Sequence, residues 1–524
     1  MAAVNRMEII KREKDGLKAI DDLYRCAKEG FESITADDFA RFRWYGVYQQ
    51  RPKTGHFMLR VNVPGGHYSS QQMRVLATIS REYGRGFSDI TTRQAYEFHW
   101  LSIQDIPDIL ERLQVAGLST IGAGGDTLRN VTGCPVAGRD RREVFNARLD
   151  AQLVSGYFRG HRDYSNLPRK FKLSISACGI NCCLAQINCI AFVGVPHGPG
   201  NFDRQGYNLY LGGGLSRSPH LARPVDIFVS RDQVLEVAVA VAEIFRDYGH
   251  REDRSRSRLK FMMDDWGLER FREEIARRIS FIPPPASPHQ LAECGHDHLG
   301  VFQQKEPGRS FIGIPIPVGR ISAKQMLALA DIADRYGSSH LANTCYQNLV
   351  IPDVLESHLP EAIDDIRAAG LTVEELSVSG DCVVCIGREF CNLAITETKT
   401  LMKRIIAFLE ENLTWDQHIR IHMNGCPNAC GHHQTADIGL LGTTARGGQE
   451  RIEAYDFFVC GHLGEDAAFA RKIASGIAAD KLPQVIASLV RAYQTTRRHK
   501  GQTFRSWCSE RRDGEIASLL GNGE

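Results

Sequence analysis

Two blocks of this 524-residue chain occur twice. Residues 64–118 recur 253 positions later, with identities in one register that include Pro64/Pro317, Gly66/Gly319, Ser69/Ser322, Gln72/Gln325 and Gln94/Gln347. A second block recurs 248 positions later, so that Cys178 and Cys182 match Cys426 and Cys430. A duplication of this length predicts two related halves, with room for a large ligand between them.

The local pattern within the first repeat is that of a mixed α/β unit. Apolar and polar residues alternate over 56–63 as in a strand, residues 70–83 have helical spacing, and 95–100 again predict a strand. Residues 8–40 mix charged residues with apolar ones at helical spacing, which predicts helices that pack on another part of the chain. The run Pro283-Pro284-Pro285 indicates a stiff linker between the halves.

Composition excludes several classes of function. The chain has 64 basic and 62 acidic residues, so bulk charge does not support nucleic-acid binding. No apolar run approaches the length of a membrane span and the first residues are charged, so we expect a cytoplasmic protein without a membrane partner. Fifteen cysteines in such a compartment are expected to be metal ligands and core residues rather than a disulfide framework.

Four cysteines form two close pairs in the second half. Five residues separate Cys385 from Cys391 and three separate Cys426 from Cys430, with 34 residues between the pairs. Convergent thiolates repel one another unless a metal neutralises them. A gap of five is wider than structural zinc sites usually show, which favours a cluster over a single ion.

The segments CIGREFC and GCPNACG resemble the signature of the siroheme- and [4Fe–4S]-containing assimilatory sulfite and nitrite reductase family. The resemblance runs from about Arg41 to about Gly442. It implies an α/β (α+β) fold of pseudo-two-fold halves, in which ferredoxin-like and mixed-sheet domains surround a central siroheme. It also implies that Cys385, Cys391, Cys426 and Cys430 hold the [4Fe–4S] cluster and that Cys430 is shared with the siroheme iron.

The repeat and the resemblance together predict seven segments. These are an N-terminal helical segment (1–45), ferredoxin-like repeat 1 (46–122), siroheme-binding domain 1 (123–282), a Pro-rich linker (283–299), ferredoxin-like repeat 2 (300–373), [4Fe–4S]/siroheme domain 2 (374–490) and a basic C-terminal tail (491–524).

The segment LPRKFKLSIS carries two lysines that would share one face of a strand starting at Lys170. Adjacent ammonium groups favour an anion beside them, although paired lysines also occur on solvated faces. By resemblance, Lys170 and Lys172 join Arg60 and Arg129 around the open face of the siroheme iron. Fixed cations there would bind an anion and supply protons.

The second lysine bears on the substrate. In the family that this chain resembles, sulfite reductases have K-x-K at this motif and plant-type nitrite reductases have K-x-N. The resemblance therefore implies that Lys172 favours sulfite, with nitrite as the alternative. Some sulfite-reducing relatives carry, shortly before the arginine that matches Arg129, a cysteine able to crosslink to a tyrosine like Tyr48. This chain has Gly124 at that position, so no crosslink is predicted. A corrin-synthesis oxygenase and a non-catalytic zinc or cluster protein are further alternatives.

Siroheme carries eight carboxylates in this family and therefore needs cationic partners. Arg93 and Arg169 resemble siroheme-contacting positions. Arg256, Arg258 and Lys260 are further candidates, although their run also fits an exposed helix face, and Gly213 would let the backbone approach the ring. We expect structural or supporting roles for the histidines after the cluster turn, His432 and His433, and for those in CGHDH after the linker, His296 and His298.

Electrons must come from a partner, because no flavin or nicotinamide fingerprint is present. The family implies ferredoxin, and the basic run with Arg497, Arg498 and Lys500 is a candidate docking surface, or simply a solvated tail. A second cysteine-rich turn, with Cys178, Cys182, Cys183 and Cys189, leaves open a second metal centre or buried free thiols.

Overall fold

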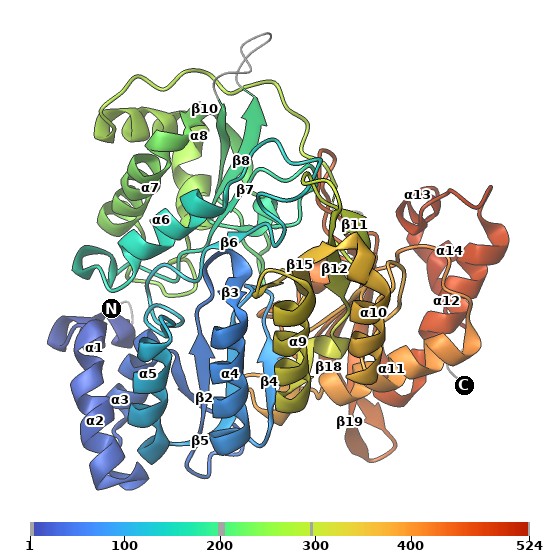
Figure 1. Cartoon of the computed structure of the whole chain (residues 1–524), viewed down its shortest axis with the longest axis horizontal. Helices are drawn as coiled ribbons and strands as arrows, with labels where there is room; N and C mark the ends of the chain where they lie inside the picture. Colours follow the sequence, from blue (N-terminus) through green and yellow to red (C-terminus); the bar gives the residue numbers. More distant parts are fainter. Residues whose placement is uncertain (1–4, 197–204, 294–296, 522–524) are drawn as a thin grey trace.

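The computed structural model describes residues 5–196, 205–293 and 297–521. Four five-stranded sheets form the framework (Figure 1). Two of them belong to the ferredoxin-like repeats, and the other two lie in the domains that follow each repeat. No described helix is long and apolar enough to cross a membrane.

Each ferredoxin-like sheet contains one strand from the other repeat. The first has the order β1 (Val47–Gln49), β2 (His56–Val61), β5 (Tyr96–Ser102), β4 (Phe87–Ile90), β13 (Arg320–Ser322). The second has the order β11 (Gly300–Gln303), β12 (Arg309–Ile314), β15 (Leu349–Leu355), β14 (His340–Asn343), β3 (His67–Ser69). Because β13 pairs with β4 and β3 with β14, the two repeats form one body with a common apolar core.

The two larger sheets have the same topology. One runs β10 (Arg223–Ser230), β9 (Gln205–Leu211), β8 (Ile190–Pro196), β7 (Leu173–Ser176), β6 (Thr132–Gly133), and the other runs β20 (Arg471–Ala478), β19 (Glu450–Val459), β18 (Ile438–Gly447), β17 (Ile421–Asn424), β16 (Cys382–Val384). In both, the three strands at the β6 or β16 end are parallel and the rest antiparallel. The predicted duplicated α/β fold is therefore confirmed.

Helices cover these sheets. In the ferredoxin-like body they are α4 (Ser70–Tyr83), α5 (Ile106–Val115), α9 (Ala323–Tyr336) and α10 (Leu359–Ala368), and α4 lies beside α9 (Figure 1). The N-terminal segment forms α1 (Arg6–Glu13), α2 (Ala19–Glu29) and α3 (Ala36–Arg41). The larger sheets are accompanied by α6 (Arg148–Phe158), α7 (Val234–Tyr248) and α8 (Leu259–Arg278), and by α11 (Lys399–Asn412), α12 (Leu482–Thr496), α13 (Phe504–Ser509) and α14 (Asp513–Ser518).

The repeated residues have matching structural roles. Ser69 caps α4 and Ser322 caps α9 through identical Ser-x-x-Gln capping boxes, which is why both the serine and the glutamine recur. Gln94 donates to the carbonyl of Asn343 at 2.7 Å, and Gln347 donates to the carbonyl of Ile90 at 2.8 Å. The identities therefore mark helix starts and the contacts that join the two repeats.

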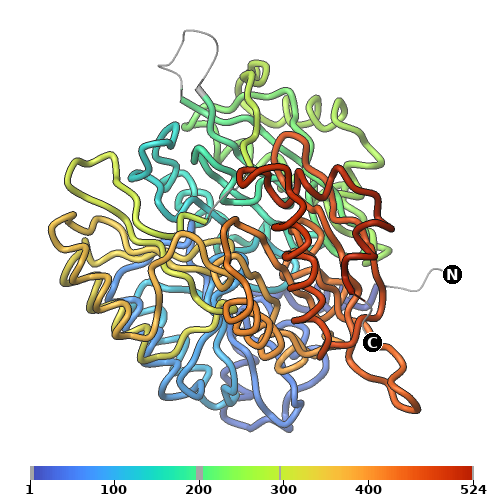
Figure 2. The backbone as a smooth tube through the Cα atoms, turned by 90° about the vertical axis from the view of Figure 1, so that its right-hand side faces the viewer, coloured from blue at the N-terminus to red at the C-terminus, as the bar shows by residue number. Residues whose placement is uncertain are grey.

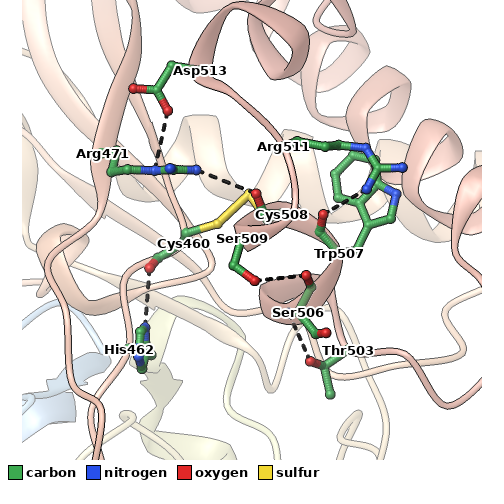
Figure 3. The surroundings of a disulfide bond; sticks show 10 residues. All are labelled: Cys460, His462, Arg471, Thr503, Ser506, Trp507, Cys508, Ser509, Arg511 and Asp513. Carbon is green, nitrogen blue, oxygen red and sulfur yellow. Dashed lines mark hydrogen bonds and ion pairs between the residues drawn. A yellow bond between two sulfur atoms is a disulfide. The ribbon is translucent and has the colours of Figure 1, made fainter.

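The C-terminal segment is folded rather than extended. Phe504 and Trp507 are buried against α12, and Cys508 forms a disulfide with Cys460 at the end of β19 (Figure 3). Figure 2 shows this segment lying along the domain that carries α11. The disulfide corrects the expectation that the cysteines serve only as ligands and core residues, because two cysteines 48 positions apart meet only once α13 has packed on the sheet.

Candidate cofactor and anion site

The four predicted cluster cysteines lie in loops at the ends of parallel strands. Cys385 directly follows β16, Cys391 lies in the next turn, and Cys426 and Cys430 lie in the turn after β17. The amide of Gly425 donates to the sulfur of Cys385 at 3.2 Å. Cys426 is buried, Cys385 and Cys391 are half-buried, and Cys430 is exposed.

The four thiols are close enough to influence one another. The pKa of Cys385 is raised to about 12, first by burial and then by Cys430 and Cys426. Burial also raises the pKa of Cys391, again with contributions from Cys430 and Cys426. Thiols held in this way become thiolate ligands only beside strong positive charge, which an iron–sulfur cluster supplies. The donor set thus fits the predicted cofactor.

Glycine is required where the cluster turn closes. A Cβ on Gly431 would lie 2.6 Å from the carbonyl oxygen of Met423 and 3.0 Å from the amide nitrogen of Cys385. No side chain fits in this space, so the turn that carries Cys430 packs directly on the loop that carries Cys385. This contact brings the two cysteine pairs together.

Lys170 and Lys172 are both half-buried, and neither forms an ion pair with a described residue. The pKa of Lys170 lies well below its usual range because of burial, Arg258 and Lys172. The pKa of Lys172 is lowered to about 7, first by burial and then by Arg93 and Arg258. By contrast, Cys430 acts to raise the pKa of both lysines. An anion at this place would restore their charge.

The strand that contains these lysines starts later than predicted. The ladder of β7 begins at Leu173, and Phe171 forms only an isolated bridge with Leu128. Phe171 is fully buried and stacks on Phe245 at 5.7 Å between ring centroids. Its insertion into the core holds the two lysines on the half-buried side.

Arg60 and Arg129 converge on one carbonyl group. Arg60 in β2 donates to the carbonyl of Ala123 at 2.9 Å, and Arg129 donates to the same carbonyl at 2.7 Å. Arg60 also pairs with Glu97 at 2.6 Å. Burial acts to lower the pKa of Arg60, but Glu97, Tyr48 and Cys430 raise it overall, so Arg60 remains charged near Cys430.

Tyr48 belongs to the same group, although sequence reasoning considered it only as a crosslink partner. Burial acts to raise the pKa of Tyr48, but Arg129 and Arg60 outweigh it and lower this pKa overall. A Cβ on Gly124 would lie 2.1 Å from the Tyr48 hydroxyl. Gly124 therefore leaves the hydroxyl uncrosslinked and beside two arginines, as an acidic O–H group facing the anion site.

The remaining predicted cofactor residues divide into two groups. Arg93, Arg169 and Arg258 lie near the lysines. The pKa of Arg93 and that of Arg169 are each lowered to about 10, mainly by burial, with Arg258 among the smaller causes. Arg256 lies on the surface, where it pairs with Asp265 at 3.2 Å. Lys260 is buried and donates to the carbonyls of Gly214 and Leu215, both at 3.3 Å.

Gly213 has a packing role toward its own chain. A Cβ there would lie 2.4 Å from the carbonyl oxygen of Gln186 and 2.5 Å from that of Asn188. Asn188 in turn accepts a hydrogen bond from Arg93 at 2.8 Å. Gly213 thus acts by letting this loop approach the one that orients Arg93.

The two halves meet at this site. Thr92 of the first half donates to the carbonyl of Cys430 at 3.1 Å. A small cavity at the junction is lined by Arg93, Lys172 and Asn188 from one half and by Cys345 and His432 from the other. Exposed Cys430 lies near cations from two separate segments, Arg60 in β2 and the lysine pair before β7, which fits a buried, anion-rich cofactor.

The predicted basic docking surface is partly neutralised. Arg497 pairs with Asp416 and its side chain is only 7% exposed, while Arg498 pairs with Glu510 at 3.2 Å. Gln502 and Trp507 are buried, and the side chain of Gln502 accepts a hydrogen bond from the amide of Arg498 at 2.8 Å. His296 lies outside the described residues, and His298 is fully buried among cysteines of the first half.

Comparison with known proteins agrees with this fold and shows the family. The family model of the nitrite and sulphite reductase 4Fe-4S domain matches residues 124–282 and 379–506. The family model of the nitrite/sulfite reductase ferredoxin-like half domain matches residues 48–116 and 302–369. The chain belongs to this family of oxidoreductases, which confirms the resemblance and the predicted enzyme class. A [4Fe–4S] cluster and siroheme are its typical cofactors.

Individual relatives include reductases of both anions. The chain is 36% identical to the assimilatory ferredoxin-dependent nitrite reductase of Haloferax mediterranei, over 93% of this chain and 88% of that protein. It is 35% identical to the ferredoxin sulfite reductase of Mycobacterium tuberculosis, over 96% and 94%. The solved structure of the Mycobacterium tuberculosis NirA protein superimposes with a TM-score of 0.92 at 34% identity, covering 98% and 97%.

Proposed function

We propose that this protein is a ferredoxin-dependent reductase that converts sulfite to sulfide. When bound, the [4Fe–4S] cluster and siroheme supply the electrons and the iron at which the anion reacts. The chain's own residues bind the anion, orient it and deliver protons. Cys385, Cys391, Cys426 and Cys430 would hold the cluster, with Cys430 also next to the siroheme iron.

One observation carries this proposal: cations from two separate segments, Arg60 in β2 and the pair Lys170 and Lys172 before β7, lie near exposed Cys430. Arg60 stays charged before substrate arrives, and a bound anion would raise the pKa of the two lysines and restore their charge. Lys170, Lys172 and the acidic hydroxyl of Tyr48 can donate protons as oxygen atoms leave, and Arg60 and Arg129 hold the anion in place. Arg93, Arg169 and Arg258 would face the carboxylates of siroheme.

Sulfite is preferred because two lysines share the site. A doubly charged anion gains more from the second ammonium group than a singly charged one does. Nitrite is the second candidate, and it is supported by the relatives named as nitrite reductases, at 36% and 35% identity.

Substituting Lys172→Asn tests this choice. We expect kcat/KM for sulfite to fall by about a hundredfold, the usual cost of removing one fixed donor to a reacting anion. Nitrite should lose less than about tenfold, so that the preference between the two anions shifts by about tenfold or more. The measurement is steady-state turnover of both anions with reduced ferredoxin.

Lys403→Asn is the control, because Lys403 is an exposed lysine of α11 far from these residues in sequence. Its kinetics should match those of the unmutated protein. An unmutated protein that prefers nitrite, and keeps that preference in Lys172→Asn, would refute sulfite as the substrate.

A further inference from the structure

A second group of metal-binding side chains lies in the first half of the molecule. The sulfur atoms of Cys134, Cys178 and Cys182 and a ring nitrogen of His298 all lie within 4.8 Å of one another. Cys134, Cys182 and His298 are 2%, 1% and 0% exposed. Among the described residues, no other group of three or more cysteine, histidine or acidic side chains is so compact, the four cluster cysteines included.

The pseudo-two-fold symmetry explains where the three cysteines come from. Cys178 and Cys182 match Cys426 and Cys430 in sequence. In the sheets, Gly133 pairs with Ile175 as Val384 pairs with Met423, and Ile175 and Met423 are 248 positions apart. Cys134 follows Gly133 as Cys385 follows Val384, so Cys134 is the counterpart of Cys385.

The glutamines of the repeat support the same equivalence independently. The amide of Gly133 donates to the side chain of Gln94 at 2.9 Å, and the amide of Val384 donates to that of Gln347 at 2.8 Å. Three of the four cluster ligands therefore have counterparts in the first half. Only Cys391 has none.

His298 supplies the missing ligand from a different place, the connection between the halves. Its Nε2 atom lies 3.7 Å from the sulfur of Cys134 and 3.7 Å from that of Cys178. Neighbouring Asp297 is anchored by Thr344 and by Asn348, whose amide donates to it at 3.0 Å. The Asp140 carboxylate lies near the imidazole, with Oδ2 3.9 Å from Nδ1, which is an ion-pair separation rather than a hydrogen bond.

We propose that Cys134, Cys178, Cys182 and His298 bind one structural Zn²⁺ ion. A tetrahedral zinc with bonds of about 2.3 Å to sulfur and about 2.1 Å to nitrogen places sulfur and nitrogen ligands roughly 3.6 Å apart, close to the observed separations. A four-iron cluster binds each ligand through a different iron and would spread them farther. Three cysteines and one histidine also leave no open coordination position, so the ion is structural.

This site replaces the set suggested by the cysteine-rich turn alone. Cys183 lies 3.7 Å from Cys182, sulfur to sulfur, but does not belong to the compact group, and Cys189 faces Arg258 at 3.5 Å. The zinc would join the strand β6, the turn after β7 and the connection between the halves. The inference does not depend on which anion is the substrate.

Metal analysis of the holoprotein tests the proposal. The protein is purified without a polyhistidine tag and without oxygen, and its metals are counted by mass spectrometry. We expect one zinc per chain in addition to the iron of the cluster and siroheme. X-ray absorption at the zinc edge should show three sulfurs at about 2.3 Å and one nitrogen at about 2.1 Å. Absence of zinc, or iron in excess of the two cofactors, would overturn the proposal.

Variants separate the ligands from other thiols. His298→Ala should lose most of the zinc while keeping the visible absorption of siroheme, and His298→Cys should retain zinc with four sulfurs. Cys26→Ser, at a buried cysteine of α2, is the control and should keep full zinc. Stoichiometric zinc in both His298→Ala and Cys178→Ser would contradict the assignment. If His298→Ala does not fold, X-ray absorption at the zinc edge of the unmutated protein decides whether three sulfurs and one nitrogen bind the ion.

Discussion

Replacing Cys430 with serine is expected to abolish the reduction of sulfite and nitrite. Cys430 is the exposed member of the cysteine set and the one that Lys170, Lys172 and Arg60 face. A hydroxyl is a much poorer iron ligand than a thiolate, so the cluster and siroheme would lose their shared contact. We expect turnover to fall at least about a thousandfold, as when one member of a set that acts as a unit is removed.

The measurement is turnover per mole of protein, together with iron content and visible absorption. Cys382→Ser is the matched control: Cys382 is 1% exposed, lies three residues before Cys385 and is not among the predicted ligands. It should keep its iron and most of its activity. Unchanged turnover in Cys430→Ser would remove Cys430 from the proposed site.

The variant Asp89→Asn is expected to lower the free energy of unfolding by about 3–5 kcal/mol, the usual cost of leaving buried charges without their partner. Asp89 is 1% exposed and pairs with Arg320 at 2.9 Å and with Lys399 at 3.4 Å. Asp89 belongs to the first repeat, Arg320 to the second and Lys399 to α11. One carboxylate therefore joins three parts of the molecule.

The pH dependence has a definite sign. Burial acts to raise the pKa of Asp89, but Lys399, His99 and Arg320 hold it well below its usual range. A depressed pKa contributes stability above the ordinary value of about 4, and that contribution is lost as the pH falls below it. The unmutated protein should therefore lose its advantage over Asp89→Asn in acid.

Denaturant unfolding followed at several pH values checks this. Asp334→Asn is the control, because Asp334 pairs with Arg74 between α4 and α9 with side chains 36% and 31% exposed. A surface pair of this kind should contribute no more than about 1 kcal/mol. Equal effects of the two substitutions would contradict the special role of Asp89.

Much of this architecture could be predicted from the sequence because duplication preserves local signals. Ser69 and Ser322 each start a helix, and the expected helix over 70–83 is observed as Ser70–Tyr83. The cysteine pairs and the lysine pair are adjacent in sequence, so their spacing alone indicates chemistry. The strand predicted to start at Lys170 nevertheless starts at Leu173, since alternation does not mark where ladder pairing begins.

What sequence reasoning missed depends on contacts between distant segments. His298 meets Cys134 and Cys178 across 164 and 120 positions, and no local pattern distinguishes it from other histidines. The sequence predicts a docking surface or a solvated tail at this end, whereas Trp507 is fully buried and Cys508 is bonded to Cys460. Tyr48 gains its acidity from Arg60 and Arg129, which only folding brings beside it.

The most direct test of the proposed function is the electron stoichiometry of the unmutated holoprotein. A reduced one-electron donor is supplied, and donor oxidised is counted against sulfide formed from sulfite and ammonia formed from nitrite. Sulfur passes from +4 to −2 and nitrogen from +3 to −3, so six electrons per product are predicted, with the higher kcat/KM for sulfite. A protein loaded with both cofactors that forms neither product would contradict the proposed function.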